Sequence, residues 1–120
     1  MNKPYFKQDS PRQFPTDDHK IILEHFGAAA TGQKDVSIAR MSAPPGWSEP
    51  YQTPEFDEYT LMVSGKKKID IDGTVVILAE GESLFVKRGT RVRYANPYDE
   101  TAEYWSVCIP AFTPESVNRE

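Results

Sequence analysis

The amino-acid sequence predicts an all-β fold, a barrel or double-sheet roll of short antiparallel strands. Short apolar segments recur along the chain between turn residues, and residues 69–72 alternate isoleucine and aspartate with the period of two that a half-buried strand shows. Asp72-Gly73 is typical of a tight hairpin turn. No segment has the 3.6-residue periodicity of a helix, so a regulator that binds DNA through a helix-turn-helix is not expected.

The expected strands follow one another with short turns between them, and they divide the chain into three parts. Residues 1–18 contain three prolines and are expected to form an extended arm, residues 19–112 to form the barrel, and residues 113–120 to form an irregular tail. Strands are expected in the segments HKIILEHFG (19–27), VSIARMSA (36–43), EYTLMVSG (58–65), KKKIDIDG (66–73), TVVIL (74–78), SLFV (83–86), TRVRY (90–94) and AEYWSVCI (102–109).

Length and charge restrict the class of protein. The 120 residues are enough for one domain. The net charge of −4 predicts no nucleic-acid partner, and no apolar run approaches the about 20 residues that cross a membrane. The first residues lack the apolar core of a signal peptide, so a cytoplasmic protein is expected. The run Lys66–Lys68 is expected to be a solvated strand start, and Cys108 is expected to be a buried, inert thiol.

Six residues in two linked stretches stand at characteristic spacings: Gly46, Glu58 and Gly65, then Gly81, Gly89 and Asn96. They resemble the two signatures of the cupin family. The first signature is G, five residues, H-x-H, three or four residues, E, six residues, G, and the second is G, five residues, P-x-G, two residues, H, three residues, N. The resemblance covers residues 46–96 and implies the cupin-type double-stranded β-helix, a jelly-roll barrel of short antiparallel strands.

The positions of the three metal-binding histidines are changed in this chain. They hold Gln52, Pro54 and Val92, so only Glu58 remains of the four ligands that the resemblance implies. A transition-metal site needs three or four nitrogen, oxygen or sulfur ligands, and we therefore expect no metal cofactor. If a divalent ion does bind, the expected ligands are Glu58, Gln52 and Glu49.

The same positions predict a pocket inside the barrel. Enclosure among apolar side chains raises the pKa of a carboxyl, so Glu58 and Tyr94 are the candidate catalytic pair for acid–base chemistry. The alternative for Glu58 is a structural acid that forms hydrogen bonds with a neighbouring strand. The resemblance and the alternation of side chains along strands supply the other expected pocket-lining residues, Gln52, Pro54, Thr60, Met62 and Val92.

Three functions remain open from the sequence. The first is a small-molecule-binding cupin with a pocket centred on Glu58, and the second is a metal-dependent or acid–base enzyme of isomerase, lyase or dioxygenase type that acts on a small polar metabolite. The third is a non-catalytic accessory protein, because EFDEYTLMVSG, with Phe56, Asp57, Glu58 and Gly65, also resembles the cupins of ethanolamine utilisation. The family resemblance further implies a homodimer in which the N-terminal arm is a candidate exchanged segment.

Overall fold

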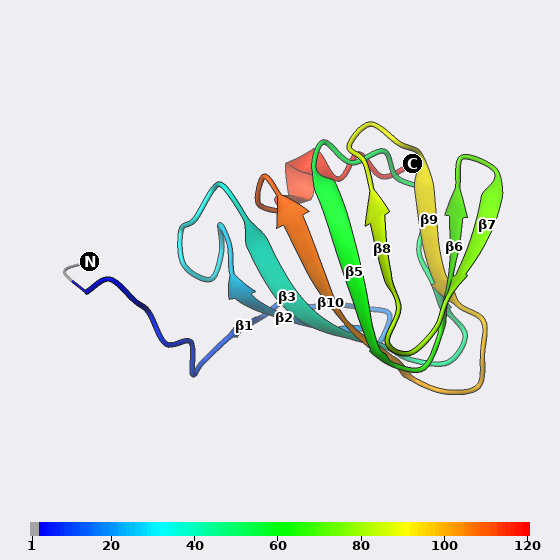
Figure 1. Ribbon diagram of the computed structural model, residues 1–120, viewed down its shortest axis with the longest axis horizontal. Helices are drawn as coiled ribbons and strands as arrows, with labels where there is room; N and C mark the ends of the chain where they lie inside the picture. Colours follow the sequence, from blue (N-terminus) through cyan, green and yellow to red (C-terminus); the bar gives the residue numbers. More distant parts are fainter. Residues whose placement is uncertain (1–2) are drawn as a thin grey trace.

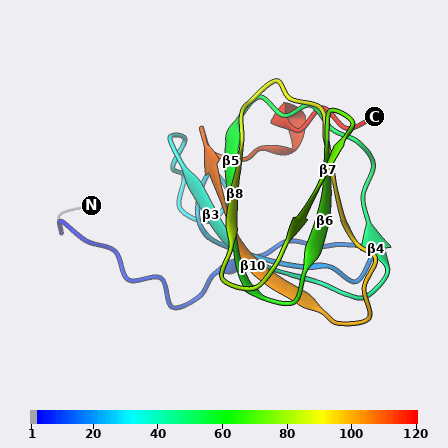
Figure 2. The ribbon, with the colours of Figure 1, turned by 45° about the vertical axis from the view of Figure 1, so that its right-hand side comes forward.

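Two antiparallel sheets face each other in the computed structural model, which describes residues 3–120 (Figures 1 and 2). The larger sheet has six strands in the order β1-β2-β3-β10-β5-β8, and the smaller sheet has four in the order β4-β9-β6-β7. Every pair of neighbouring strands is antiparallel. The predicted all-β jelly-roll fold is therefore confirmed.

All eight segments that the sequence predicts as strands form strands: β2 (Ile21–Phe26), β3 (Ser37–Ala43), β5 (Asp57–Ser64), β6 (Lys67–Ile71), β7 (Thr74–Leu78), β8 (Ser83–Val86), β9 (Val92–Asn96) and β10 (Ala102–Ile109). Three further elements were not predicted, namely β1 (Arg12–Gln13), β4 (Trp47–Ser48) and a 3-10 helix, η1 (Pro114–Ser116). Each is two or three residues long, too short to show a periodicity. No helix in the described part of the chain is long and apolar enough to cross a membrane.

The turns of this fold depend on backbone angles that most side chains avoid. Asp72 (φ 50°) and Gly73 (φ 91°) join β6 to β7 with two left-handed residues, as a type I′ hairpin requires. Gly65 (φ 76°) ends β5, and a Cβ atom there would lie 2.5 Å from the backbone oxygen of Thr101. Gly65, the last residue of the first signature, therefore keeps the end of β5 in contact with the start of β10.

Asn96, the last residue of the second signature, joins two turns through the hydrogen bonds of its side chain. Its side chain is fully buried, and its Nδ2 donates hydrogen bonds to the backbone oxygens of Ala43 (3.1 Å), Pro44 (3.3 Å) and Glu100 (2.8 Å). Its Oδ1 accepts a hydrogen bond from the Tyr98 backbone N–H. The last residue of the second signature thus holds the turn before β4 against the turn after β9.

The space between the sheets contains two apolar clusters. The larger cluster includes Met62, Ile69 and Val92 and extends to Tyr94 and Tyr104. A smaller cluster is formed by Phe56, Cys108 and Val117, with Phe112 packed against it. A cavity lies between the two, because residues of both clusters line it.

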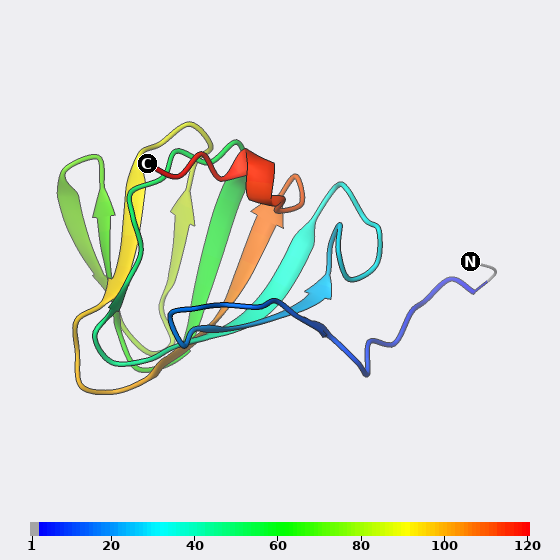
Figure 3. The same ribbon diagram turned by 180° about the vertical axis from the view of Figure 1, so that it is seen from behind.

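The two ends of the chain close the cavity side of the sandwich. Residues 116–120 run beside residues 51–55, joined by backbone hydrogen bonds from Glu55 to Ser116 (2.9 Å) and from Glu120 to Tyr51 (2.9 Å). Figure 3 shows this C-terminal segment in red and the N-terminal segment that leads into β2 in blue. Residues 3–11, before β1, extend away from the sheets (Figure 1), although the Gln8 side chain donates a hydrogen bond to the His25 backbone oxygen. The first two residues of the predicted N-terminal arm lie outside the described part of the chain.

Candidate functional site

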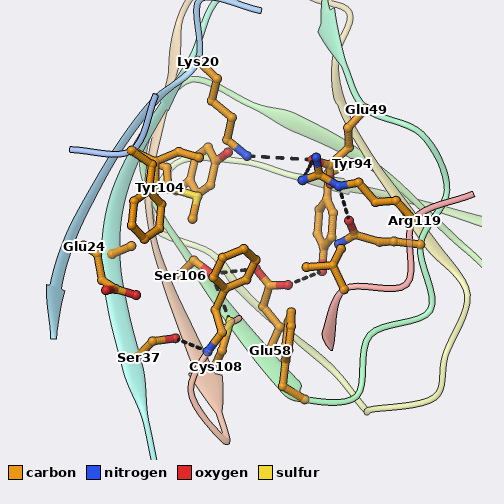
Figure 4. A pocket seen from close by; sticks show the side chains of 18 of the residues that line it. Lys20, Glu24, Ser37, Glu49, Glu58, Tyr94, Tyr104, Ser106, Cys108 and Arg119 are labelled. Carbon is orange, nitrogen blue, oxygen red and sulfur yellow. Dashed lines mark hydrogen bonds and ion pairs between the residues drawn. The ribbon is translucent and has the colours of Figure 1, made fainter. Parts of the chain in front are cut away.

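An internal cavity of about 70 Å³ lies between the sheets, and a groove of about 650 Å³ adjoins it on the outside. Phe14, Lys20, Glu49, Phe112 and Arg119 line both spaces, so the groove leads to the cavity. Figure 4 shows that most of the side chains at the cavity wall carry polar groups. The polar side chains are those of Lys20, Glu24, Ser37, Glu49, Gln52, Glu58, Lys67, Tyr94, Tyr104, Ser106, Cys108 and Arg119.

Several of these side chains point into the cavity because successive side chains of a strand point to opposite faces of the sheet. Tyr104, Ser106 and Cys108 occupy successive inward positions of β10, the strand that pairs with both β3 and β5. Glu58 lies on the neighbouring β5, directly opposite Cys108 in the register. β10 therefore presents three side chains to the cavity. The neighbouring strand β5 presents the Glu58 carboxyl beside them.

Glu58 is held by two hydroxyl groups. Its Oε2 accepts a hydrogen bond from Ser106 Oγ (2.6 Å), and its Oε1 accepts one from the Tyr94 hydroxyl (3.3 Å) (Figure 4). Loss of water raises the pKa of Glu58, although the Ser106 hydrogen bond and the charge of Lys67 lower it in part. The carboxyl therefore keeps its proton to a higher pH than an ordinary glutamic acid does.

Burial keeps two neighbours of Glu58, Tyr94 and Cys108, in their protonated forms. Burial and the charge of Glu58 raise the pKa of Tyr94 well above its ordinary value, so the phenol stays a hydrogen-bond donor. Burial also raises the pKa of the Cys108 thiol, whose Sγ lies 3.8 Å from Ser106 Oγ. The thiolate is the reactive form of cysteine, so Cys108 is a buried, inert thiol, as predicted.

Three cations at the cavity were not predicted as site residues. Lys67 is only 2% exposed, so the expectation of a solvated Lys66–Lys68 run is wrong for its middle residue. Lys20 Nζ lies 4.0 Å from Glu49 Oε2, and an Arg119 nitrogen lies 3.5 Å from the same oxygen. Burial alone would lower the pKa of Lys20, but Tyr104 and the carboxylates of Glu49 and Glu58 raise it above its ordinary value.

One sequence signal pointed to Lys67. It shares the parity of Ile69, whose side chain is fully buried, so the alternation along β6 turns both inward. No comparable signal exists for Lys20, which precedes β2, or for Arg119, which follows the last strand. Tyr104 is a fourth residue that sequence reasoning missed, although it occupies an inward position of β10.

The residues expected to line the pocket fall into two groups. Gln52, Glu58 and Tyr94 come together at the cavity wall. Val92 and Met62 are buried in the larger apolar cluster, outside the cavity wall. Thr60 is 1% exposed and Pro54 is also buried, and neither lines the cavity.

The donor set does not fit a metal ion of the kind that the family signatures imply. The histidine positions hold an amide, a proline and a valine, and both oxygens of Glu58 already accept hydrogen bonds from the protein. Glu49 pairs with Lys20 and Arg119. Within residues 3–120 no group of three histidine, cysteine, aspartate or glutamate side chains is arranged to hold a metal.

The fold and the signature residues define a cupin, and comparison with known proteins agrees. A family model described as the cupin domain matches residues 39–110, more than half of the chain, so the chain belongs to the cupin family. A curated protein of Myxococcus xanthus named endoribonuclease YbeY is 48% identical over 106 residues, which is 88% of this chain and 36% of that protein. The chain thus spans about a third of the length of the curated relative that it matches.

Solved structures share the fold at low identity. A variant of oxalate decarboxylase from Bacillus subtilis is similar to this chain with a TM-score of 0.80 and 15% identity. The match covers 95% of this chain and 31% of the oxalate decarboxylase chain. An RmlC-like cupin from Shewanella frigidimarina matches with a TM-score of 0.73 and 13% identity over 91% of this chain and 92% of its own. A variant of Streptomyces PAC13, solved with uridine, matches all of this chain and 92% of its own with a TM-score of 0.77 and 15% identity.

Proposed function

We propose that this cupin binds a small polar molecule in the cavity and exchanges a proton with it through Glu58. The observation that carries the proposal is the Glu58 carboxyl, which lies at the wall of a partly open cavity between the sheets and has a raised pKa. A carboxyl of this kind gives up and takes back a proton at a pH closer to neutrality, which suits a general acid or base.

The surroundings of Glu58 support an acid–base reaction. Tyr94 and Ser106 fix the orientation of the carboxyl, and Lys67 supplies a positive charge that stabilises negative charge on a bound molecule. The corresponding reaction moves a proton from a carbon next to a carbonyl group to Glu58 and returns it to the same or a neighbouring atom. Isomerases and lyases that act on small carbonyl or hydroxyl compounds perform steps of this type.

The size of the cavity limits the molecule. About 70 Å³ accommodates roughly five water-sized groups, and the outer groove has room for the remainder of a longer molecule. The PAC13 variant solved with uridine gives a precedent for a small polar molecule with a protein of similar fold and length, although its 15% identity supports only the fold.

A screen of small polar metabolites by thermal shift tests binding, and deuterium uptake by the bound molecule in D2O, followed by NMR, tests proton exchange. Glu58→Gln is expected to keep binding and to slow exchange by about 100-fold or more, the usual contribution of a general acid or base. Glu80→Gln is the matched control, because Glu80 is exposed on the turn before β8.

Two outcomes would contradict the proposal. Either no polar molecule raises the melting temperature, or Glu58→Gln exchanges deuterium as fast as the unchanged chain. Both assays are run with and without EDTA, and equal results are expected because the donor set at the cavity does not fit a metal.

A second candidate function is that of an accessory module. The 48% identity to a segment of a protein named as an endoribonuclease supports a role beside such an enzyme, and the segment EFDEYTLMVSG supports a role like that of the ethanolamine-utilisation cupins. Copurification with an endoribonuclease, together with unchanged function of Glu58→Gln, would favour this candidate over the first.

A further inference from the structure

The cavity contains a buried positive charge without a direct counter-charge. Lys67 is 2% exposed, and its ammonium group forms no ion pair with a carboxylate anywhere in residues 3–120. Its Nζ lies 3.6 Å from the centre of the Tyr104 ring and 4.5 Å from the centre of the Tyr94 ring. Cation–π contacts stabilise a lysine, but by less than the removal of its charge from water destabilises it.

A second polar group at the cavity wall also lacks a partner. The Tyr104 hydroxyl belongs to a side chain that is 1% exposed. Lys20 is near enough to Tyr104 to have its pKa raised by it, but no atom of residues 3–120 meets the hydroxyl in hydrogen-bond geometry. Nearly all buried hydroxyl groups in proteins form at least one hydrogen bond. An unpaired ammonium and an unpaired hydroxyl at one cavity are what an anion-binding site presents before its ligand arrives.

Lys20 approaches the same aromatic side chains from the N-terminal segment. Its Nζ lies 4.4 Å from the centre of the Trp47 ring and 6.0 Å from the centre of the Tyr104 ring. Lys67 Nζ contacts these two rings as well, at 5.8 Å and 3.6 Å. The two lysines therefore converge on one part of the cavity.

The carboxylates at the cavity already have partners. Glu49 lies 4.0 Å from Lys20 and 3.5 Å from Arg119. Glu24 accepts a hydrogen bond from the Ala30 backbone N–H (2.8 Å). Glu58 accepts two hydrogen bonds from hydroxyl groups, and Lys67 acts on it only from beyond ion-pair distance. Among the three cations at the cavity, Lys67 is thus the one that no carboxylate of residues 3–120 contacts at ion-pair distance.

We propose that the cavity binds a short-chain monocarboxylate whose carboxylate lies against Lys67 and accepts a hydrogen bond from the Tyr104 hydroxyl, with Lys20 as the second cation. This inference names the ligand class of the function proposed above and rests on it. One negative charge matches the one unpaired ammonium, whereas a dianion such as phosphate would meet Glu49 and Glu58. A cavity of about 70 Å³ suits a molecule of roughly two to four carbons.

Titration calorimetry with acetate, glycolate and lactate, each beside its uncharged amide, tests the inference. The carboxylates are expected to bind and the amides are not. Lys67→Met keeps the length of the side chain without its charge, and it is expected to weaken carboxylate binding by roughly 10- to 100-fold. Lys68→Met is the matched control, because Lys68 is the next residue of β6 and points outward to solvent.

Tyr104→Phe keeps the test decisive if Lys67→Met does not fold, because it removes only the unpaired hydroxyl, and a smaller loss of affinity is expected. Equal affinity for acids and amides, or carboxylate affinity unchanged in both Lys67→Met and Tyr104→Phe, would overturn the inference. Binding of an uncharged polar molecule without any carboxylate binding would overturn this inference alone and leave the proposed function standing. If no molecule of either kind binds, both fail.

Discussion

The Glu58 side chain lies where the surroundings favour its protonated form. Loss of water is the largest influence on its pKa, and the hydroxyl of Ser106 and the charge of Lys67 oppose it only in part. A carboxyl whose pKa is raised by folding binds its proton more tightly in the folded chain than in the unfolded chain. Glu58 therefore couples the stability of the fold to pH.

The sign of that coupling gives a prediction for Glu58→Gln. The contribution of Glu58 is fully present below its ordinary pKa of 4.5 and is lost as the pH rises through the higher pKa of the folded state. Glutamine has no proton to lose, so the melting temperature of the variant should fall less between pH 4.5 and neutrality than that of the unchanged chain. Melting curves by circular dichroism at several pH values measure the difference, with Glu80→Gln as control. Parallel profiles of melting temperature against pH for Glu58→Gln and the unchanged chain would refute the prediction.

Two glycines that follow strands, Gly65 and Gly89, have left-handed backbone angles that most residues avoid. Gly65 and Gly89 have nearly the same left-handed backbone angle (φ 76° and 79°), but they differ in their surroundings. A Cβ atom at Gly65 would collide with the backbone of Thr101 and Ala102, whereas one at Gly89 would meet nothing within 4 Å. A side chain at Gly89 would therefore cause backbone strain alone, whereas a side chain at Gly65 would cause the same strain and a collision with the backbone of β10 and the turn before it.

Substitution by alanine measures the difference. Gly89→Ala is expected to lower the free energy of unfolding by about 1–2 kcal/mol, the usual strain of a left-handed residue with a side chain. Gly65→Ala should cost clearly more, about 3 kcal/mol or above, because the end of β5 has to move away from β10. Urea unfolding of both variants checks this, and equal losses would show that the contact at Gly65 relaxes freely.

The outer face of the larger sheet is unusually apolar for a surface. Tyr59, Leu61 and Val63 of β5, Phe85 of β8 and Ile109 of β10 are 39–49% exposed. The three strands that carry these residues are about 4.8 Å apart and up to eight residues long, so they cover roughly 400 Å² in projection, about half of the about 800 Å² that each partner buries in a standard interface. We expect a second copy of the chain to cover this face, as the family resemblance also implies.

The mass in solution, measured by light scattering after gel filtration, tests this expectation. The unchanged chain should elute as a dimer, and Leu61→Glu combined with Phe85→Glu should shift it to a monomer because two charges would be buried in the interface. Val75→Glu is the control, since Val75 is 51% exposed but lies on β7 of the other sheet. A monomer at all concentrations, or dissociation by Val75→Glu, would contradict the expectation.

The sequence by itself determined the fold class, the eight longer strands and the hairpin at Asp72-Gly73, because these depend on short-range patterns: the alternation of side chains, the conformational freedom of glycine and the signature spacings. It also identified Glu58 as the inward acid of β5. Only the tertiary structure assembled the charges around that acid. Lys20 and Arg119 come from opposite ends of the chain, and both approach Glu49, because the two terminal segments pack over the same side of the sandwich. Contacts between residues so far apart leave no local pattern in the sequence.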